Sequence, residues 1–210
     1  MASCSWPMRR APLFGALIVA IALLSGCSKQ ARLAPLSGDA VLLAFGDSLT
    51  YGTGANEEES YPAQLARLIG RQVVREGIPG EVSAAGLARL PAALDEHRPK
   101  LLLLCHGGND FLRRQPAQQA AENVRAMIRL AKGRGIEVLL IGTPEPGITL
   151  TPPGFYAEIA KEFAIPYEGS VLGAILRDGS LKADQVHPNA RGYRLMAERV
   201  FELLKRSGAV

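Results

Sequence analysis

Three short apolar runs stand out along the chain, and each ends at a glycine or a polar residue. They span 41–45, 101–105 and 138–141, and two weaker runs of the same kind span 73–74 and 163–167. Apolar residues follow one another in these runs without alternating with polar ones, which is typical of strands buried on both faces. The pattern therefore predicts parallel strands that helices cover on both sides of a sheet.

Longer segments with apolar residues at helical spacing separate these runs. They predict helices over five ranges, which are 61–69, 82–97, 116–132, 155–162 and 189–205. Strands that alternate with helices in this way predict one three-layer α/β domain over 41–210, with right-handed crossovers. Ligands of such sheets bind beyond the carboxyl ends of the strands, so we expect the functional residues in the loops that begin there.

The N-terminal segment has the layout of an export signal. Arg9 and Arg10 precede an apolar stretch over 11–24, the order found in secretory signals. As a helix, this stretch reaches roughly 21 Å, shorter than the ~30 Å hydrocarbon core of a bilayer, which disfavours a permanent membrane span. The following Leu24-Ser-Gly-Cys27 resembles the lipobox of bacterial lipoproteins, and this resemblance implies lipidation of Cys27. A plain signal peptide that contains a cysteine is the alternative.

We therefore expect a signal peptide over 1–27, a tether over 28–40, where no period is sustained, and the folded domain from 41 onward. The protein is expected to be exported and lipid-anchored in the bacterial cell envelope, facing the periplasm. Because Cys4 leaves with the signal and Cys27 would carry the lipid, only Cys105 remains in the domain, so no intramolecular disulfide is expected. We expect Cys105 to pack as a small hydrophobe.

Composition narrows the class of protein further. Apolar residues make up 48% of the chain, enough for a substantial core. The 24 basic and 20 acidic side chains give a formal charge of +4, but the basic ones are scattered and form no stripe. Nucleic acid is therefore not an expected partner.

Polar residues that could take part in catalysis follow the first and second strong runs. Gly46-Asp47-Ser48 comes directly after 41–45, which puts Ser48 at a strand exit, where a backbone N–H at a helix start favours an anion. Capping of a helix by Asp47 and Ser48 is the structural alternative. Gly107-Gly108-Asn109-Asp110 closes 101–105, and Asn109 carries an amide able to donate two hydrogen bonds. A simple Asn-Asp turn is the alternative there.

Asp184 and His187 precede the last predicted helix. In a turn, a carboxylate and an imidazole at this spacing can meet, which leaves the second ring nitrogen free to take a proton. One His and one Asp are too few ligands for a metal site, so no metal is expected. Helix capping by Asp184 is the structural alternative, and Pro188 is expected in the first turn of that helix.

Taken together, the blocks GDSLTYG from Gly46, GGND from Gly107 and DQVHPN from Asp184 resemble the SGNH, or GDSL, hydrolase family. The segment from Gly77 to Glu81 best fits the remaining block, with Gly80 as the matching glycine, although Pro79 and Glu81 depart from the usual pattern. The Gly86-Leu-Ala-Arg-Leu90 segment and the GGND context look especially like the bacterial thioesterase I, lysophospholipase and arylesterase branch.

This resemblance implies a flavodoxin-like sheet of five parallel strands and hydrolysis of esters or thioesters without a cofactor. It implies Ser48 as nucleophile, His187 as base and Asp184 as the residue that orients it. The implied oxyanion donors are the backbone N–H groups of Ser48 and Gly80 and the side-chain amide of Asn109. A carbohydrate O-deacetylase is the nearest alternative reaction, and an inactive lipid-anchored binding protein of the same fold is the non-enzymatic alternative.

Substrate choice is less strongly marked in the sequence. The segment 143–155 holds four prolines and several apolar residues, and we suggest that it lines an acyl pocket. A plain connecting loop is the alternative. Arg113 and Arg114 could bind a phosphate head group, although such a pair is more often simply exposed to solvent. His106 is expected to be structural or to support the site from behind. For an exported enzyme, lysophospholipids and short-chain or aryl esters are more plausible substrates than acyl-CoA.

Overall fold

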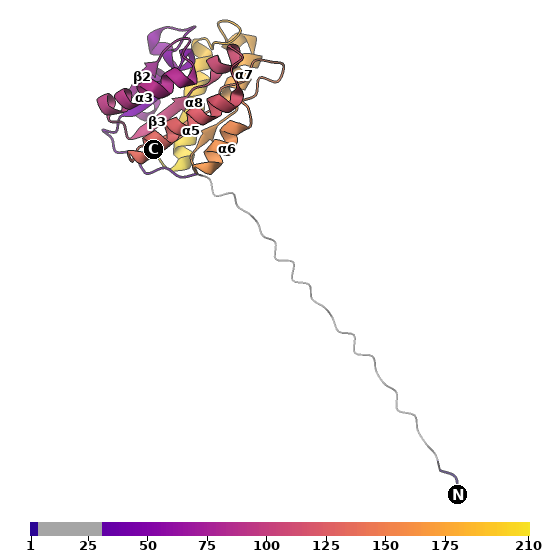
Figure 1. Ribbon diagram of the computed structural model, residues 1–210. Coiled ribbons are helices and arrows are strands. Elements are labelled where there is room, and N and C mark those ends of the chain that lie inside the picture. Colours follow the sequence, from indigo (N-terminus) through magenta and orange to yellow (C-terminus); the bar gives the residue numbers. More distant parts are fainter. Residues whose placement is uncertain (4–30) are drawn as a thin grey trace.

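The computed structural model of the protein describes residues 1–3 and 31–210 (Figure 1). The strands form one parallel sheet in the order β2-β1-β3-β4-β5, the flavodoxin-like order. Their bounds are Leu42–Gly46 (β1), Val73–Gly77 (β2), Leu101–Cys105 (β3), Glu137–Ile141 (β4) and Tyr167–Glu168 (β5). The predicted fold class is confirmed, whereas the predicted lipobox and nearly all of the predicted signal lie outside the described residues.

Helices cover both faces of the sheet. The longer ones are Tyr61–Ile69 (α2), Ser83–His97 (α3), Ala117–Gly133 (α5), Phe155–Glu162 (α6), Val171–Arg177 (α7) and Ala190–Ser207 (α8). Short helices are Ser48–Tyr51 (α1) and Gly108–Leu112 (α4), and 3-10 turns span Glu57–Glu59 and Gly179–Leu181. In Figure 1, α3 and α5 lie in front of the sheet and the yellow α8 lies behind it.

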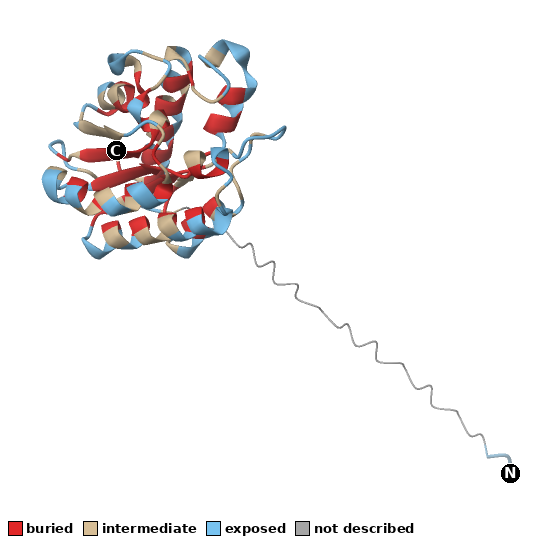
Figure 2. Cartoon of the chain, turned by 45° about the horizontal axis from the view of Figure 1, so that its top comes forward, coloured by how far each residue is buried: buried red, intermediate tan, exposed pale blue. Residues whose placement is uncertain are grey.

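Alternate residues of the central strands divide the core into two layers. Leu43 and Phe45 pack with α3, α5 and α6, whereas Leu42 and Ala44 pack with α2, α7 and α8. All five residues of β1 and all five of β3 are buried, which explains why their sequences are continuously apolar. Figure 2 shows the central strands in red, the edge strand β2 in tan, and the helices with one buried and one exposed face.

The register brings the loops of interest to one edge of the sheet. Gly46 at the end of β1 pairs with Gly77 of β2 and with Cys105 of β3. Cys105 in turn pairs with Ile141, and Ile141 pairs with Glu168. The loops that leave these strands therefore start side by side.

The helix and strand predictions agree with the structure to within a few residues, except at the last strand. The run 163–167 was expected to be a strand, but only Tyr167 and Glu168 pair with β4. Ala164 has a φ of 50°, and the backbone N–H of Ile165 donates to Ala160, so the first part of the run closes the end of α6. Ile165 still belongs to the core, which accounts for its apolar character.

The described part of the predicted tether, 31–40, packs along the domain. Leu33 is buried in the core layer of α8, and its backbone N–H donates to Ser207. Leu36 donates to Ala209, and the Arg71 side chain donates to the carbonyls of Leu36 and Ser37. This part of the segment is thus attached to the domain, in contrast to the predicted tether, because Leu33 and Leu36 bury apolar surface that an isolated tether would expose.

Residue 31 lies at the amino-terminal edge of the sheet, since the backbone N–H of Ala34 donates to the Glu137 side chain at the start of β4. Within the described chain, none of the helices combines the length and the apolarity that crossing a membrane requires.

Candidate active site

Ser48 lies where the chain leaves β1 and turns into α1. Gly46 ends the strand, and a Cβ atom at this position would overlap the carbonyl oxygen of Cys105, so a glycine lets the two strands end this close together. Asp47 caps α1 by accepting a hydrogen bond from the backbone N–H of Leu49 at 3.0 Å. Ser48 is the first residue of the helix, at the strand exit that the sequence predicts.

The side chains of Ser48, His187 and Asp184 form a hydrogen-bonded row. His187 Nε2 lies 3.0 Å from Ser48 Oγ, and His187 Nδ1 lies 2.8 Å from Asp184 Oδ2. In the tautomer that suits both contacts, Nδ1–H donates to the carboxylate and Nε2 accepts from the serine hydroxyl. A base within hydrogen-bond reach of a hydroxyl, itself held by a third group, is the geometry that activates a serine.

The turn that carries Asp184 and His187 is closed by its own hydrogen bonds. Asp184 Oδ1 accepts from the backbone N–H groups of Val186 and His187, both at 2.8 Å. Asn189 caps α8 by accepting from the backbone N–H groups of residues 191 and 192. Asp184 therefore does not cap that helix, and Pro188 precedes the cap instead of lying in the first helical turn as expected. The turn is fixed by Asp184 and the helix by Asn189.

Hydrogen bonding keeps Asp184 ionised. Partial burial raises the pKa of this carboxyl group, but the hydrogen bonds from the His187 ring and from the backbone N–H groups of Val186 and His187 lower it, and the net pKa lies below its ordinary value. The carboxylate is thus suited to hold Nδ1–H and to stabilise a positive imidazolium.

The two other residues implied as oxyanion donors border the same cavity as Ser48 and His187. Gly80 lies in a turn with a φ of 78°, in which the backbone N–H of Glu81 donates to Ile78. Asn109 lies in the first turn of α4, and its Nδ2 donates to Asp47 Oδ2 at 3.2 Å and to the Glu81 carbonyl at 3.0 Å. Ser48, Gly80, Asn109 and His187 therefore all line one space. Asp184 does not line it but contacts His187 Nδ1.

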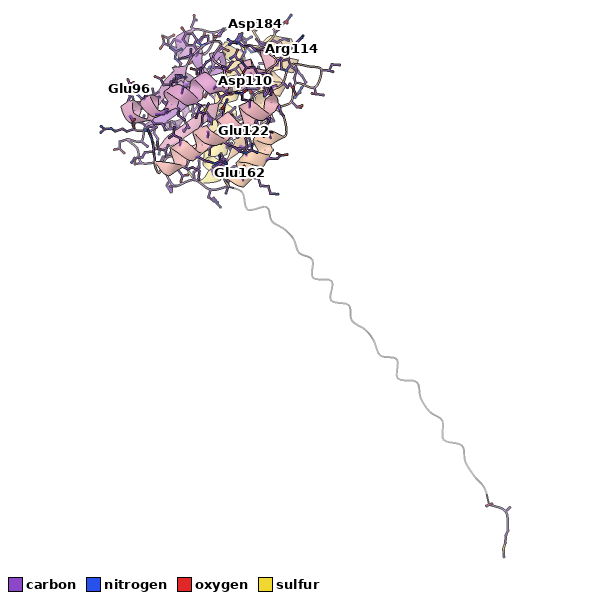
Figure 3. All side chains as sticks on the ribbon, in the orientation of Figure 1. Glu96, Asp110, Arg114, Glu122, Glu162 and Asp184 are labelled. Atoms are coloured by element: carbon purple, nitrogen blue, oxygen red, sulfur yellow. The ribbon has the colours of Figure 1, made fainter. Side chains whose placement is uncertain are left out.

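That space is a cavity of about 600 Å³ at the carboxyl edge of the sheet. Of the segment 143–155, residues 143–147 and Leu150 line it, whereas Ile148 is fully exposed and Phe155 stacks on Tyr156. Other apolar lining residues are Leu49, Pro79, Leu112, Leu176 and Val186. Figure 3 shows Asp184 and Arg114 at this end of the domain and Glu162 at the other.

The remaining candidates have structural contacts. Arg113 donates to the carbonyl of Gly80 at 2.7 Å and does not line the cavity. His106 is fully buried, and its Nε2 lies 3.0 Å from Glu81 Oε2. Cys105 is a buried free thiol whose pKa is raised by burial. Over 31–210, no three His, Cys, Asp or Glu side chains gather closely enough to hold a metal ion.

Sequence reasoning missed three residues of this site. Asp47 was interpreted only as a cap, yet it also contacts Asn109. It is buried, and burial raises its pKa against the opposing effects of His106 and of the backbone N–H of Leu49. Glu81 was noted only as a departure from a motif, and Arg89 only as part of the context around Gly86. No local sequence pattern marks Glu81 or Arg89 as site residues, because the contact between them depends on how α3 packs against the sheet.

A serine, an imidazole and a carboxylate in hydrogen-bonded order beside a cavity at the carboxyl edge of a parallel sheet define the class of serine hydrolases. The model of the GDSL-like lipase/acylhydrolase family matches residues 44–195. The chain belongs to this family, as the sequence blocks implied, and it is a carboxylic ester hydrolase.

Individual relatives agree with this assignment. Esterase TesA of Pseudomonas aeruginosa is 31% identical over 202 residues, which cover 87% of this chain and 96% of the relative. Thioesterase 1/protease 1/lysophospholipase L1 of Escherichia coli K12 is 32% identical over 165 residues, which cover 75% of this chain and 79% of the relative. A crystal structure of TesA matches with a TM-score of 0.70 and 30% identity, covering 80% of this chain and 99% of the other.

The contact between His187 and Asp184 predicts a measurable shift. In a His187→Ala variant, the Asp184 pKa should rise toward its ordinary value of 3.8, because the ring's hydrogen bond is the largest effect that lowers it. An NMR titration of the side-chain carboxyl carbons measures this pKa. Asp178 is the control in the same spectrum, since its pKa is lowered by hydrogen bonds from Ser180 and should not move.

The sign of the linked stability follows from the lowered pKa. The ionised Asp184 stabilises the folded chain above the unfolded carboxyl pKa, and this contribution is lost as the pH falls through the folded pKa. The His187→Ala variant should therefore lose less stability than the wild type on acidification below about pH 4. An Asp184 pKa that is the same in both proteins would contradict this assignment.

Proposed function

We propose that the chain hydrolyses acyl esters through an acyl-enzyme formed on Ser48. The observation that carries this proposal is the row of contacts in which His187 Nε2 lies 3.0 Å from Ser48 Oγ and Nδ1 lies 2.8 Å from Asp184 Oδ2. His187 takes the hydroxyl proton as Ser48 Oγ attacks the acyl carbonyl carbon, and Asp184 stabilises the resulting imidazolium. His187 then protonates the departing alcohol or thiol as its bond to the acyl carbon breaks.

The second half of the cycle uses the same groups. A water molecule gives a proton to His187 Nε2 and attacks the acyl carbon, the bond to Ser48 Oγ breaks, and the proton returns to the serine. The free acid leaves and the starting state is restored. This cycle needs no cofactor.

In this proposal, the developing oxyanion accepts hydrogen bonds from the backbone N–H groups of Ser48 and Gly80 and from Asn109 Nδ2. Both amide hydrogens of Asn109 are engaged in the free site, by Asp47 at 3.2 Å and by the Glu81 carbonyl at 3.0 Å. The longer bond to Asp47 is the one that an oxyanion would replace. Donation to the oxyanion therefore keeps Asn109 attached to Glu81 while the reaction proceeds.

We propose aryl and short-chain acyl esters and lysophospholipids as the substrate class, with thioesters as further candidates. The cavity is lined largely by apolar and proline residues, which suits an acyl chain or an aromatic ring. Three exposed apolar side chains lie at or beside the cavity. Leu112 is one of its lining residues, and Ile78 and Ile148 are the sequence neighbours of the lining residues Pro79 and Gly147. The names of the relatives, which include esterase, thioesterase and lysophospholipase, agree with this class.

Substitution of the proposed nucleophile and of one oxyanion donor tests the mechanism. Hydrolysis of p-nitrophenyl octanoate should fall by about 10³-fold or more in Ser48→Ala, because the oxyanion donors and binding alone remain. In Asn109→Ala it should fall by about 10²- to 10³-fold, the usual effect of removing one donor. The measurement is kcat by release of nitrophenol, with circular dichroism to verify the fold of each variant.

Retention of most activity by a folded Ser48→Ala variant would contradict the role of Ser48. A wild type without hydrolysis of any ester would favour the inactive binding protein. Release of acetate from acetylated glycans, without release of fatty acid from lysophosphatidylcholine, would favour the carbohydrate O-deacetylase.

The size of the cavity should limit acyl-chain length. Leu176 lines the cavity, so Leu176→Trp should lower kcat/KM for p-nitrophenyl octanoate relative to acetate by about tenfold, the effect of losing a methylene or two of pocket space. Ile148→Trp is the matched control, because Ile148 is exposed and does not line the cavity. Equal ratios in both variants would place the acyl chain elsewhere.

We propose that the protein is exported and held in the bacterial cell envelope, facing the periplasm, by a lipid on Cys27. The proposal rests on Arg9 and Arg10, the apolar stretch 11–24 and the cysteine that follows it. The arrangement of the domain suits such an anchor. Residue 31 lies at the amino-terminal edge of the sheet, whereas Asp184 lies at the carboxyl edge (Figure 3), so an anchor would leave the cavity open.

Metabolic labelling in a bacterial host tests the anchor. The wild type should incorporate an alkyne analogue of palmitate and fractionate with membranes, and Cys27→Ser should do neither, because serine lacks the thiol that carries the lipid. Cys105→Ser is the matched control, since the Cys105 thiol is buried in the core, and it should label like the wild type. Equal labelling of Cys27→Ser and the wild type would exclude Cys27 as the lipid site.

A further inference from the structure

A buried ion cluster lies directly behind the proposed oxyanion donors. The Glu81 carboxylate accepts two hydrogen bonds from Arg89, from Nε at 2.8 Å and from Nη2 at 3.0 Å. Its Oε2 also lies 3.0 Å from His106 Nε2, on a ring that is fully buried. The Glu81 side chain itself is only 6% exposed. A charge this deeply buried requires such partners to remain ionised.

The Glu81 carboxylate is ionised at neutral pH. Burial raises the pKa of Glu81, but the hydrogen bonds from His106 and Arg89 and the charge of Arg89 lower it, and the net pKa lies below its ordinary value. An ionised carboxylate accepts at both oxygens, which matches the donors that face it.

Arg89 connects this carboxylate to the rigid part of the fold. Its Nη2 donates to the carbonyl of Gly46, the last residue of β1, at 3.2 Å and to that of Glu76, the last but one of β2, at 2.9 Å. Its guanidinium lies over the Phe45 ring, 4.0 Å from the ring centroid. The guanidinium is thus held by two strand ends and by a core aromatic ring, and Glu81 is in turn held by the guanidinium.

Glu81 is joined to two of the three proposed oxyanion donors, Gly80 and Asn109. It follows Gly80, whose left-handed φ of 78° places it in a turn outside any strand or helix. The carbonyl of Glu81 accepts from Asn109 Nδ2 at 3.0 Å. One residue therefore joins the Gly80 turn to the Asn109 amide through its backbone, and joins both to the sheet through its carboxylate.

We propose that Glu81 is a positioning residue that sets the Gly80 N–H and the Asn109 amide toward the oxyanion, with Arg89 and His106 holding its carboxylate. This inference rests on the proposed function and extends it to a residue that does not touch the substrate. Oxyanion donors act by being in place before charge develops. A support that fixes their position therefore contributes to kcat and leaves the binding of the ground state almost unchanged.

Glu81→Gln tests this role in the full-length protein. The substitution keeps the shape of the side chain but removes its charge. It also places an amide NH₂ opposite Arg89 or His106, so that one donor faces another donor where the carboxylate accepted a hydrogen bond. We expect kcat for p-nitrophenyl octanoate to fall by about 10- to 100-fold, the range that follows from a misplacement of around 1 Å. KM should stay within about twofold, because ground-state binding is not altered.

An inhibitor that copies the tetrahedral state gives a readout that a purely structural role would not move. An alkyl boronic acid adds to Ser48 Oγ and places a negative oxygen among the donors, whereas octanol occupies the cavity without such an oxygen. The Ki of the boronic acid should rise by the same factor by which kcat/KM falls. The Ki of octanol should stay unchanged.

Glu76→Gln is the matched control. Glu76 also binds Arg89, through Oε2 and Nη1 at 2.9 Å, but it lies near the end of β2 and forms no hydrogen bond with Gly80 or Asn109. It should lower the melting temperature without changing kcat or the boronic acid Ki. Glu81→Asp retains the charge and should recover most of the activity lost in Glu81→Gln, and it carries the test if Glu81→Gln does not fold.

The outcomes separate the two proposals. An active wild type together with a folded Glu81→Gln variant of unchanged kcat and boronic acid Ki would overturn the positioning role alone. The positioning role would also be overturned if Glu81→Asp lost as much activity as Glu81→Gln. It would likewise be overturned if the control Glu76→Gln lost as much activity as Glu81→Gln. A wild type with no ester hydrolysis, indistinguishable from Ser48→Ala, would overturn the proposed function and this role with it.

Discussion

The parallel pairing of β1 with β3 is the constraint on which the site depends. Both strands are fully buried, so each backbone N–H and carbonyl must be paired within the sheet, since an unpaired buried group costs about 1–3 kcal/mol. This requirement fixes the register, in which Gly46 lies opposite Cys105. Ser48 and Asn109 follow the ends of these two strands by only a few residues. The sheet therefore determines the distance between them.

The acid-base side of the site is fixed by different contacts. His187 is 139 residues away from Ser48 in the sequence, and it reaches the serine because α8 packs beside α2 on one face of the sheet. Tyr193 of α8 donates to the carbonyl of Thr53, just after α1, at 2.8 Å, and so joins the two segments again. The proposed nucleophile and its proposed base thus belong to separate elements whose relative position the core determines.

Two buried carboxylates lie next to the oxyanion residues, and their surroundings differ. Burial raises the pKa of Asp47, whereas Arg89 and His106 outweigh burial at Glu81 and lower its pKa. Asn109 donates to the side chain of the first and to the backbone of the second. The Asn109 amide is therefore held between the Asp47 carboxyl group, which is harder to ionise, and the Glu81 peptide group, which the ion cluster holds in place. This arrangement suits the proposed exchange of one hydrogen-bond partner when charge develops.

The sequence alone is enough to recognise the central strands, the main helices and the residues proposed to carry the chemistry, because continuous burial and turn chemistry are local properties. It also gave the order Ser48, Asn109, Asp184, His187, and the resemblance of these blocks implied the fold. Only the tertiary structure decided that Ala164 closes α6, so that most of 163–167 is not strand, and that Leu33 packs against the domain. It alone joined Glu81 to Arg89 and His106, since side chains far apart in the chain meet only once the layers have packed.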